Sequence, residues 1–315
     1  MKSDWVEKPP HCGGFSTQTR TRGADLNGVE WFRELVEPWM RLEQRDLPWR
    51  RSRDPWEVLV AECMLQQTQV ARVVPRWEAF LDRFPQVHDC ARAPLSETIR
   101  MWEGLGYNRR AVQLHRCSVL VSQEFDGRFP SDLPALLRLP GVGPYTARAI
   151  LAFAFERDAA VLDTNVARIL SRCVVGRRLG LSEAQAVADS LVPTGRGWEW
   201  NQGMLDLGAM VCTKRAPRCD ACPVRSCCAW RTDPGNPVDP AEGSAAVTTR
   251  QSRFQGSDRQ LRGRLVDALR RGPVKVFELG RVSRCCEADR IEKVVRSLIT
   301  DGLAVSTGEV LTLAP

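Results

Sequence analysis

Apolar residues recur at helical spacing through most of this chain. Between Trp31 and Trp230 they fall at every third or fourth position, which is the period of one face of an α-helix. The clearest examples are the segments 29–43, 54–74, 95–105, 147–155 and 183–192. Alternating strand patterns are nearly absent in this range. The pattern therefore predicts an all-α domain over residues 29–230.

The pattern changes on both sides of this domain. Residues 1–28 are polar and rich in Gly and Thr, which predicts a loose tail. Residues 231–257 are rich in Pro, Gly and Ser, which is typical of a linker. The last segment, 258–315, combines helical spacing with two short alternating runs around a glycine-containing turn.

The final segment predicts a small separate unit. Helical spacing covers residues 258–271, 274–282 and 287–302, and the two strand-like runs lie within 303–313. Three helices followed by a hairpin are the plan of a winged helix. We therefore expect a winged-helix-like α+β unit over 258–315.

Composition narrows the function classes. The chain has 315 residues, of which 43% are hydrophobic and 26% charged, so it can bury a core. Its formal net charge of +7 favours a polyanionic partner such as nucleic acid. The first residues contain no apolar run like that of a signal peptide, and no segment is long and apolar enough to span a membrane. We therefore expect a cytosolic protein whose thiols stay reduced.

Five of the twelve cysteines lie within residues 212–228, next to four basic side chains. Four of them have the spacing C-x6-C-x2-C-x5-C, namely Cys212, Cys219, Cys222 and Cys228. A structural zinc site usually offers two C-x2-C pairs, and only one is present here. The spacing instead favours a single loop around an iron–sulfur cluster. A zinc knuckle or a loop of reduced cysteines is the alternative.

The segment LPGVGPYTARAI, residues 139–150, places two glycines just before a predicted helix. Such a turn can bring the backbone N–H groups of Gly141 and Gly143 to a phosphate at the helix N-terminus. Because this contact reads no base, it would only position a nucleic-acid backbone. The alternative is that the glycines simply end one helix before the next.

Two acidic residues stand in contrasting sequence surroundings. Asp163 follows an apolar run and precedes Thr164 and Asn165, so it is expected to cap a helix and to stay ionised there. Glu62 lies inside the apolar run VLVAECML. It either turns to water or lies in an apolar pocket, where a raised pKa would make it a general acid.

Taken in order, the motifs resemble a known family. They are LPWR (47–50), AECMLQQTQV (61–70), WEGLGY (102–107), LPGVGPYTARA (139–149), VLDTNVARIL (161–170), LDLGAMVCTKRAPRC (205–219) and the cysteine loop. This ordered set resembles the helix-hairpin-helix DNA glycosylases, specifically the MutY-type adenine glycosylases, over roughly residues 30–230. The resemblance implies a two-lobed all-α fold with a 4Fe–4S cluster on the four cysteines. The segment after the linker resembles the short form of some actinobacterial members.

The resemblance implies roles for the catalytic residues. Glu62 matches the glutamate that protonates adenine, and Asp163 matches the aspartate that stabilises the oxocarbenium ion, with Asn165 beside it. Tyr145 stands where the strand-nicking endonuclease III relatives carry a lysine nucleophile. Because tyrosine cannot form an imine, the resemblance implies hydrolysis without lyase activity.

The resemblance also implies DNA contacts. Gln67 and Tyr107 match residues that wedge beside the base opposite the target. The wall of the adenine pocket is matched by Arg45, Leu47, Arg50 and Gln202. Asn108 departs from the family, since many relatives have a second tyrosine there.

The expected substrate is double-stranded DNA holding adenine opposite 8-oxoguanine or guanine, bound by a monomer in the bacterial cytosol at the nucleoid. Many relatives check the opposite base with a larger C-terminal domain related to Nudix hydrolases, for which about sixty residues are too few. Substrate choice therefore depends on the helical domain.

Two alternatives stay open at this point. The first is an endonuclease III-like enzyme for oxidised pyrimidines, or a glycosylase for another mismatched base, although Tyr145 argues against lyase chemistry. The second is a redox-responsive regulator that binds DNA through its iron–sulfur loop and winged helix without catalysis. The regulator predicts binding to one DNA sequence and no base release.

Overall fold

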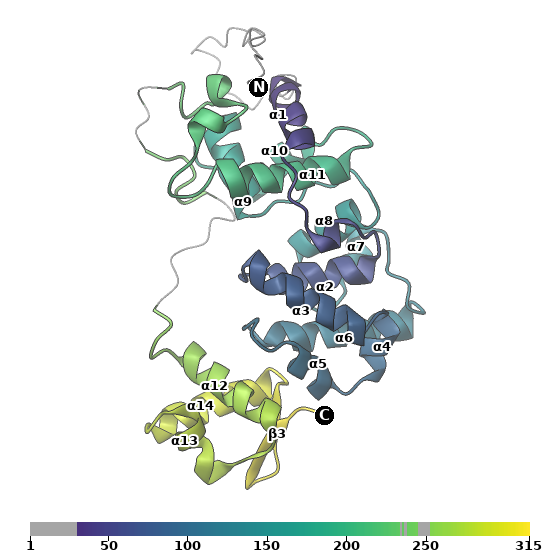
Figure 1. Ribbon diagram of the computed structural model, residues 1–315, viewed down its shortest axis with the longest axis vertical. Coiled ribbons are helices and arrows are strands. Elements are labelled where there is room, and N and C mark those ends of the chain that lie inside the picture. The colour runs from purple at the N-terminus through teal and green to yellow at the C-terminus, as the bar shows by residue number, and fades with distance from the viewer. Residues whose placement is uncertain (1–29, 234, 236–237, 245–252) are drawn as a thin grey trace, which may run out of the picture. The chain divides into compact units, whose positions relative to one another are not determined.

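A computed structural model describes residues 30–233, 235, 238–244 and 253–315, which form two compact units. Among the described residues, unit 1 comprises 30–45 and those within 158–244, and unit 2 comprises 46–157 and 253–315. Figure 1 follows the chain through both units. The predicted tail, residues 1–28, lies outside the described residues. No helix in the described part of the chain is long and apolar enough to cross a membrane.

Unit 1 is helical throughout its described part. Its elements are α1 (Glu30–Leu42), α9 (Thr164–Ile169), η3 (Leu170–Val175), α10 (Leu181–Leu191), α11 (Gly197–Asp206), η4 (Leu207–Val211), η5 (Cys219–Ala221) and η6 (Arg225–Cys227). The segments η3 and η4 are π-helical continuations of α9 and α11. Wide turns of this kind are rare and often occur at functional sites.

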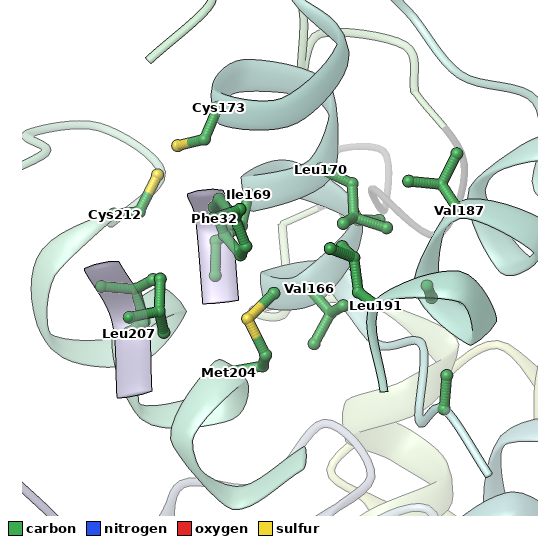
Figure 2. Close-up of a cluster of buried hydrophobic side chains, with 14 of the residues drawn as sticks. Phe32, Val166, Ile169, Leu170, Cys173, Val187, Leu191, Met204, Leu207 and Cys212 are labelled. Atoms are coloured by element: carbon green, nitrogen blue, oxygen red, sulfur yellow. The ribbon is translucent and has the colours of Figure 1, made fainter. Parts of the chain in front are cut away.

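The core of unit 1 forms where one apolar face of α1 meets α9, α10 and α11. Phe32, Val36 and Met40, spaced by four residues, are buried on the same face of α1. They pack against a cluster that includes Val166, Ile169, Leu170, Val187, Leu191, Met204 and Leu207. Figure 2 shows this core with Cys173 and Cys212 together at one edge. The cysteine loop is therefore attached to the same core that supports α9.

Unit 2 contains the second set of helices. They are η2 (Pro48–Arg50), α2 (Pro55–Leu65), α3 (Val70–Arg83), α4 (Val87–Arg92), α5 (Leu95–Met101), α6 (Arg109–Glu124), α7 (Leu133–Leu137) and α8 (Pro144–Phe153). Asp54 caps α2 by accepting a hydrogen bond from Trp56 N at 2.7 Å. Every residue of α2 from Val58 to Met64 is buried, because α3, α6 and α8 surround it. A helix that is apolar on all faces is stable only in such an interior position.

The C-terminal part of unit 2 mixes helices and strands. Its elements are α12 (Asp258–Arg271), β1 (Val274–Lys275), η7 (Val276–Glu278), α13 (Leu279–Ser283), α14 (Ala288–Thr300), β2 (Ala304–Ser306) and β3 (Val310–Leu313). The strands form an antiparallel sheet in the order β1-β3-β2. The predicted hairpin is confirmed, and the fold class is the predicted one.

One predicted helix in this part begins too early. The apolar spacing of 274–282 predicted a helix, but Val274 pairs with Leu311 and Lys275 pairs with Val310. A strand of two residues has no measurable period, so its sequence pattern cannot be distinguished from the start of the following helix.

Part of the predicted linker packs on unit 1. Asp239 binds the buried guanidinium of Arg172, at 2.9 Å from Nε. Ser244 is 4% exposed and accepts a hydrogen bond from the Ser171 hydroxyl at 2.9 Å. Residues 238–244 therefore form a strap against η3, while 245–252 lie outside the described residues.

Candidate active site and cysteine loop

Asp163 caps the N-terminus of α9, as its sequence position predicted. One carboxylate oxygen accepts hydrogen bonds from the backbone N–H groups of Asn165 at 2.8 Å and Val166 at 2.7 Å. The other accepts one from the Asn165 side-chain amide at 2.8 Å. Three donors therefore fix the orientation of one carboxylate.

The pKa of Asp163 is raised above its ordinary value, because burial disfavours the charged form more than the three hydrogen bonds favour it. Asp163 was expected to stay ionised because the helix dipole and the backbone donors favour the charged form, and burial acts against both of these effects. The helix N-terminus and the three hydrogen-bond donors reduce the rise in the pKa of Asp163 without cancelling it. Sequence position revealed the donors but not the depth of burial.

Asn165 is held in turn by Arg168, a residue that the sequence analysis did not single out. The Arg168 guanidinium donates to the Asn165 side-chain oxygen at 2.7 Å and to the Gly208 carbonyl at 2.7 Å. Its Nε donates to the backbone carbonyl of Cys212 at 2.7 Å. A single buried arginine thus connects the Asp163 cap with the first cysteine of the loop.

Gly208 allows α9 and η4 to approach closely. A Cβ at this position would lie 2.5 Å from the Asn165 Cβ, which is closer than real contacts allow. Only glycine can therefore stand there while Asn165 keeps its bond to Asp163. The motif LDLGAM contains Gly208, but the sequence does not show that Asn165 is the residue that Gly208 approaches.

Both predicted pocket residues of unit 1 depend on α11. Arg45 binds a residue of this helix, and Gln202 is part of it. Arg45 binds the buried carboxylate of Asp206 through its backbone N–H at 3.0 Å and its side chain at 2.5 Å. Gln202 lies one turn earlier on α11 and is 5% exposed. Gln202 and Asp206 are therefore both held in the interior of unit 1.

Five cysteines, not four, line one hollow of unit 1 with a volume of about 320 Å³ that includes open space at its mouth. They are the four predicted ligands Cys212, Cys219, Cys222 and Cys228, together with Cys173 from η3. The Cys228 and Cys173 sulfurs are 3.8 Å apart. Cys173 was missed because it precedes the loop by nearly forty residues.

Positive charge and thiol contacts favour the thiolate form of two cysteines in this hollow, whereas burial raises the pKa of Cys222 to about 11. The pKa of Cys212 is lowered by hydrogen bonding to Cys173 and to the Arg172 guanidinium, whose Nη1 lies 3.6 Å from the sulfur. The pKa of Cys228 is also lowered, chiefly by Cys173. Arg172 itself is held by Asp239 and stacks on Trp230 at 5.0 Å.

The cysteine sulfurs that line the hollow are the donor type that an iron–sulfur cluster takes. In the described part of the chain, no group of three or more His, Cys, Asp or Glu side chains is placed to hold one metal ion. Four sulfurs spread around a hollow nevertheless match the ligand set of a larger iron–sulfur cluster. The residues therefore fit the predicted cofactor.

Glu62 lies in the middle of α2 and is 5% exposed. Its neighbours in the helix, from Val58 to Met64, are buried as well. Of the two positions that the sequence left open, turned to water or buried among apolar residues, the structure has the second.

Two loops of unit 2 present the predicted wedge residues. Gln67, after α2, and Tyr107, before α6, are both exposed and both have a positive φ, 58° and 45° respectively. Arg110 joins the loops, because its guanidinium donates to Cys63 O at 2.6 Å and Gly106 O at 3.2 Å. It also reaches Thr68 Oγ1 at 3.1 Å.

The glycine turn lies between α7 and α8, as the sequence predicted. Gly141 has φ 77°, and a Cβ there would lie 2.7 Å from the Gln113 side chain, so glycine is required. Gly143 caps α8, and both glycines are exposed. Tyr145 is partly buried in the first turn of this helix.

The remaining pocket residues of unit 2 lie at η2. Leu47 caps this short helix and is partly buried, whereas the Arg50 side chain is 8% exposed. The structure therefore places the predicted residues in two groups. Unit 1 holds Asp163, Asn165, Arg45, Gln202 and the four cysteines, and unit 2 holds Glu62, Leu47, Arg50, Gln67, Tyr107, Gly141, Gly143 and Tyr145.

Comparison with known proteins agrees with these arrangements. Residues 60–188 match the family model described as HhH-GPD superfamily base excision DNA repair protein. The chain is 41% identical over 282 residues to an adenine DNA glycosylase of Mycolicibacterium smegmatis, which covers 86% of this chain and 92% of that protein. It is 38% identical over 224 residues to the human adenine DNA glycosylase, covering 66% of this chain and 40% of the human protein.

Solved structures resemble the helical part. A thermostable thymine-DNA glycosylase superposes with a TM-score of 0.60 at 30% identity, covering 64% of this chain and 95% of that chain. Endonuclease III trapped on DNA has a TM-score of 0.57 at 23% identity, covering 65% and 96%, and shares the fold. The similarity to the mycobacterial protein extends over nearly all of both chains and excludes the non-enzymatic regulator. The chain therefore belongs to the adenine DNA glycosylase family of base excision repair enzymes.

Proposed function

We propose that this enzyme releases adenine mispaired with 8-oxoguanine or guanine in double-stranded DNA, acting as a monomer in the bacterial cytosol at the nucleoid. The observation that supports it best is the contrast between two carboxyl groups. Asp163 accepts three hydrogen bonds at a helix N-terminus, whereas Glu62 is buried in an apolar helix. N-glycosidic cleavage needs one carboxyl group that donates a proton and one that stays charged.

The proposed reaction begins after the target nucleotide leaves the base stack. Glu62 gives its proton to N7 of adenine, and the bond between C1′ and N9 breaks with its electron pair moving to the base. The sugar becomes an oxocarbenium ion, which the Asp163 carboxylate stabilises. Water then adds to C1′ and loses a proton, leaving neutral adenine and an abasic site. Asn165 orients Asp163 through the amide contact at 2.8 Å.

Tyr145 supports hydrolysis without strand nicking. A phenol cannot form the imine that a lysine forms with the sugar aldehyde. Reduction with borohydride should therefore trap almost no covalent protein–DNA adduct. A high yield of adduct would favour the endonuclease III-like alternative.

The exposed loops supply the proposed DNA contacts. The glycine turn offers backbone N–H groups to a phosphate, with Gly141 and Gly143 both exposed. Gln67 and Tyr107 are exposed on loops that Arg110 ties together, so they can fill the space beside the opposite base. Arg45, Leu47, Arg50 and Gln202 form the proposed pocket wall.

We expect a 4Fe–4S cluster on Cys212, Cys219, Cys222 and Cys228. When bound, such a cluster orders the loop that holds it. Arg172 offsets the charge of the thiolates through its contact with the Cys212 sulfur. Anaerobically purified protein should carry about four irons per chain. Cys219→Ser should lose the iron, whereas Cys173→Ser, in the same hollow, should keep it. Stoichiometric zinc would contradict the proposal.

A panel of duplexes tests the substrate. Four duplexes hold adenine opposite 8-oxoguanine, guanine, cytosine or thymine. A fifth duplex holds thymine opposite guanine. Base release is measured in single turnover, with and without alkali. We expect adenine release opposite 8-oxoguanine and guanine. Preferential thymine release would favour a glycosylase for another mismatched base, an alternative to which the 30% identity with a thymine-DNA glycosylase gives weight.

A further inference from the structure

Arg270, on the C-terminal helix α12, is an arginine with an unusually enclosed side chain. It is 7% exposed, and its burial lowers its pKa. Its Nε donates to the Ile99 carbonyl at 3.0 Å, and its Nη2 donates to the Asn108 side-chain oxygen at 2.8 Å. A buried guanidinium with this set of acceptors fixes the parts of the chain that supply them.

Those acceptors lie at the two ends of one loop. Ile99 is in the last turn of α5, where its carbonyl also accepts a hydrogen bond from Trp102 N at 3.3 Å, and Asn108 directly precedes α6. Between them runs the segment 102–108, which we call the tyrosine loop because it carries Tyr107. All of these residues and Arg270 belong to unit 2. One side chain of the C-terminal part therefore bridges the start and the end of the tyrosine loop.

The tyrosine loop needs such support. Gly104, Gly106 and Tyr107 have φ values of 81°, 71° and 45°. A left-handed conformation is costly for tyrosine and persists only where the surroundings impose it. Arg110 holds the loop through Leu105 O and Gly106 O, both at 3.2 Å. Arg270 holds its two ends, and Asn108, the next residue after Tyr107, is 8% exposed.

We propose that the C-terminal part of this chain positions the Tyr107 wedge, and that Arg270 is the positioning residue that acts through Asn108. The small winged-helix-like part thereby supports insertion into DNA without touching the reacting base. Arg109 beside Asn108 also lies 3.7 Å from the Asp301 carboxylate, which adds a second contact between the same segments. This inference rests on the proposed wedge role of Tyr107.

The test uses a duplex in which 2-aminopurine replaces the neighbour of the base opposite the target. The target is a non-cleavable 2′-fluoroadenosine, so that the fluorescence rise reports unstacking alone. In the full chain, Arg270→Ala should lower the fluorescence amplitude at saturating protein at least about twofold. On a cleavable duplex it should slow single-turnover base release by about tenfold to a hundredfold, as expected for a displaced group.

Three further variants make the outcome decisive. Asn108→Ala removes the acceptor on the loop side and should reproduce both effects, even if Arg270→Ala folds poorly. Arg264→Ala removes another α12 guanidinium, which binds Ser283 O at 3.1 Å on α13, and should change neither readout. Tyr107→Ala should abolish the amplitude, and adding Arg270→Ala to it should cause no further loss.

The outcomes separate this inference from the wedge proposal. If Tyr107→Ala keeps the parental amplitude, the wedge role of Tyr107 fails. If Tyr107→Ala abolishes it while Arg270→Ala and Asn108→Ala keep parental amplitude and rate, the positioning role is overturned. If adding Arg270→Ala to Tyr107→Ala slows base release further, by as much as Arg270→Ala does alone, the inference is also contradicted.

Discussion

Asp163 and Glu62 are both carboxyl groups on helices, yet they differ in their hydrogen-bond donors and in their position along the helix. Asp163 stands at a helix N-terminus, accepts three hydrogen bonds and is partly buried. Glu62 stands inside a helix whose neighbouring residues are all buried. Hydrogen-bond donors favour a carboxylate, whereas an apolar interior favours the neutral acid.

The difference also extends to how each group is supported. Asn165, Arg168 and the Cys212 backbone form a continuous chain of bonds behind Asp163. Glu62 is positioned by the packing of α2 against α3, α6 and α8. A charged stabiliser must be oriented by dipoles, whereas a proton donor needs a dry position and a defined rotamer. In the proposed mechanism, two carboxyl groups would serve opposite halves of the same reaction.

The largest expected effect comes from removing the proton donor. Glu62→Gln keeps the shape of the side chain but cannot protonate the leaving base, so base release should fall by about a hundredfold to ten-thousandfold. DNA affinity should stay at the parental value. The fall in rate at high pH should disappear, since no acid remains to be ionised. Single-turnover release at the parental rate would refute the assigned role.

Asp163→Asn should cost almost as much. The amide carries no charge to stabilise the cation-like transition state, and such stabilisation is worth about a hundredfold to a thousandfold in rate. Because both residues act at one barrier, the double variant should lose less than the product of the single effects. A fully multiplicative loss would show that the two carboxyl groups act in separate steps.

The sequence alone predicted some features of the two carboxyl groups and of the cysteine loop, but not others. The cap of Asp163 and the four-cysteine spacing are local patterns, so neighbouring residues sufficed to predict them. The pKa direction of Asp163 depends on burial, which its sequence neighbours do not indicate. Cys173, Arg168 and Arg270 act through contacts with segments far from them in sequence, which no spacing can reveal without a fold.

A smaller effect should follow from loosening the support of Asp163. Asn165→Ala removes the side-chain donor that favours the charged carboxylate, so the pKa of Asp163 should rise further. Asp163 must be ionised to act, so the acidic limb of the rate profile should move to higher pH while the plateau changes little. Glu62→Gln, measured in parallel, should keep the parental acidic limb. An unmoved limb in Asn165→Ala would mean that the amide only maintains local structure.

The smallest effect concerns stability. The folded pKa of Asp163 is raised above the usual 3.8, so the native state binds more protons than the unfolded state between these two values. The contribution of Asp163 therefore opposes folding progressively as pH rises through that window, and it stays unfavourable above it.

Asparagine caps helices as well as aspartate and has no charge to bury. Asp163→Asn should consequently unfold at a higher temperature than the parent at neutral pH. That difference should shrink toward zero as the buffer is lowered to about pH 4. Thermal unfolding of both proteins across this range measures it, and a lower midpoint for Asp163→Asn at neutral pH would mean that the three hydrogen bonds outweigh burial after all.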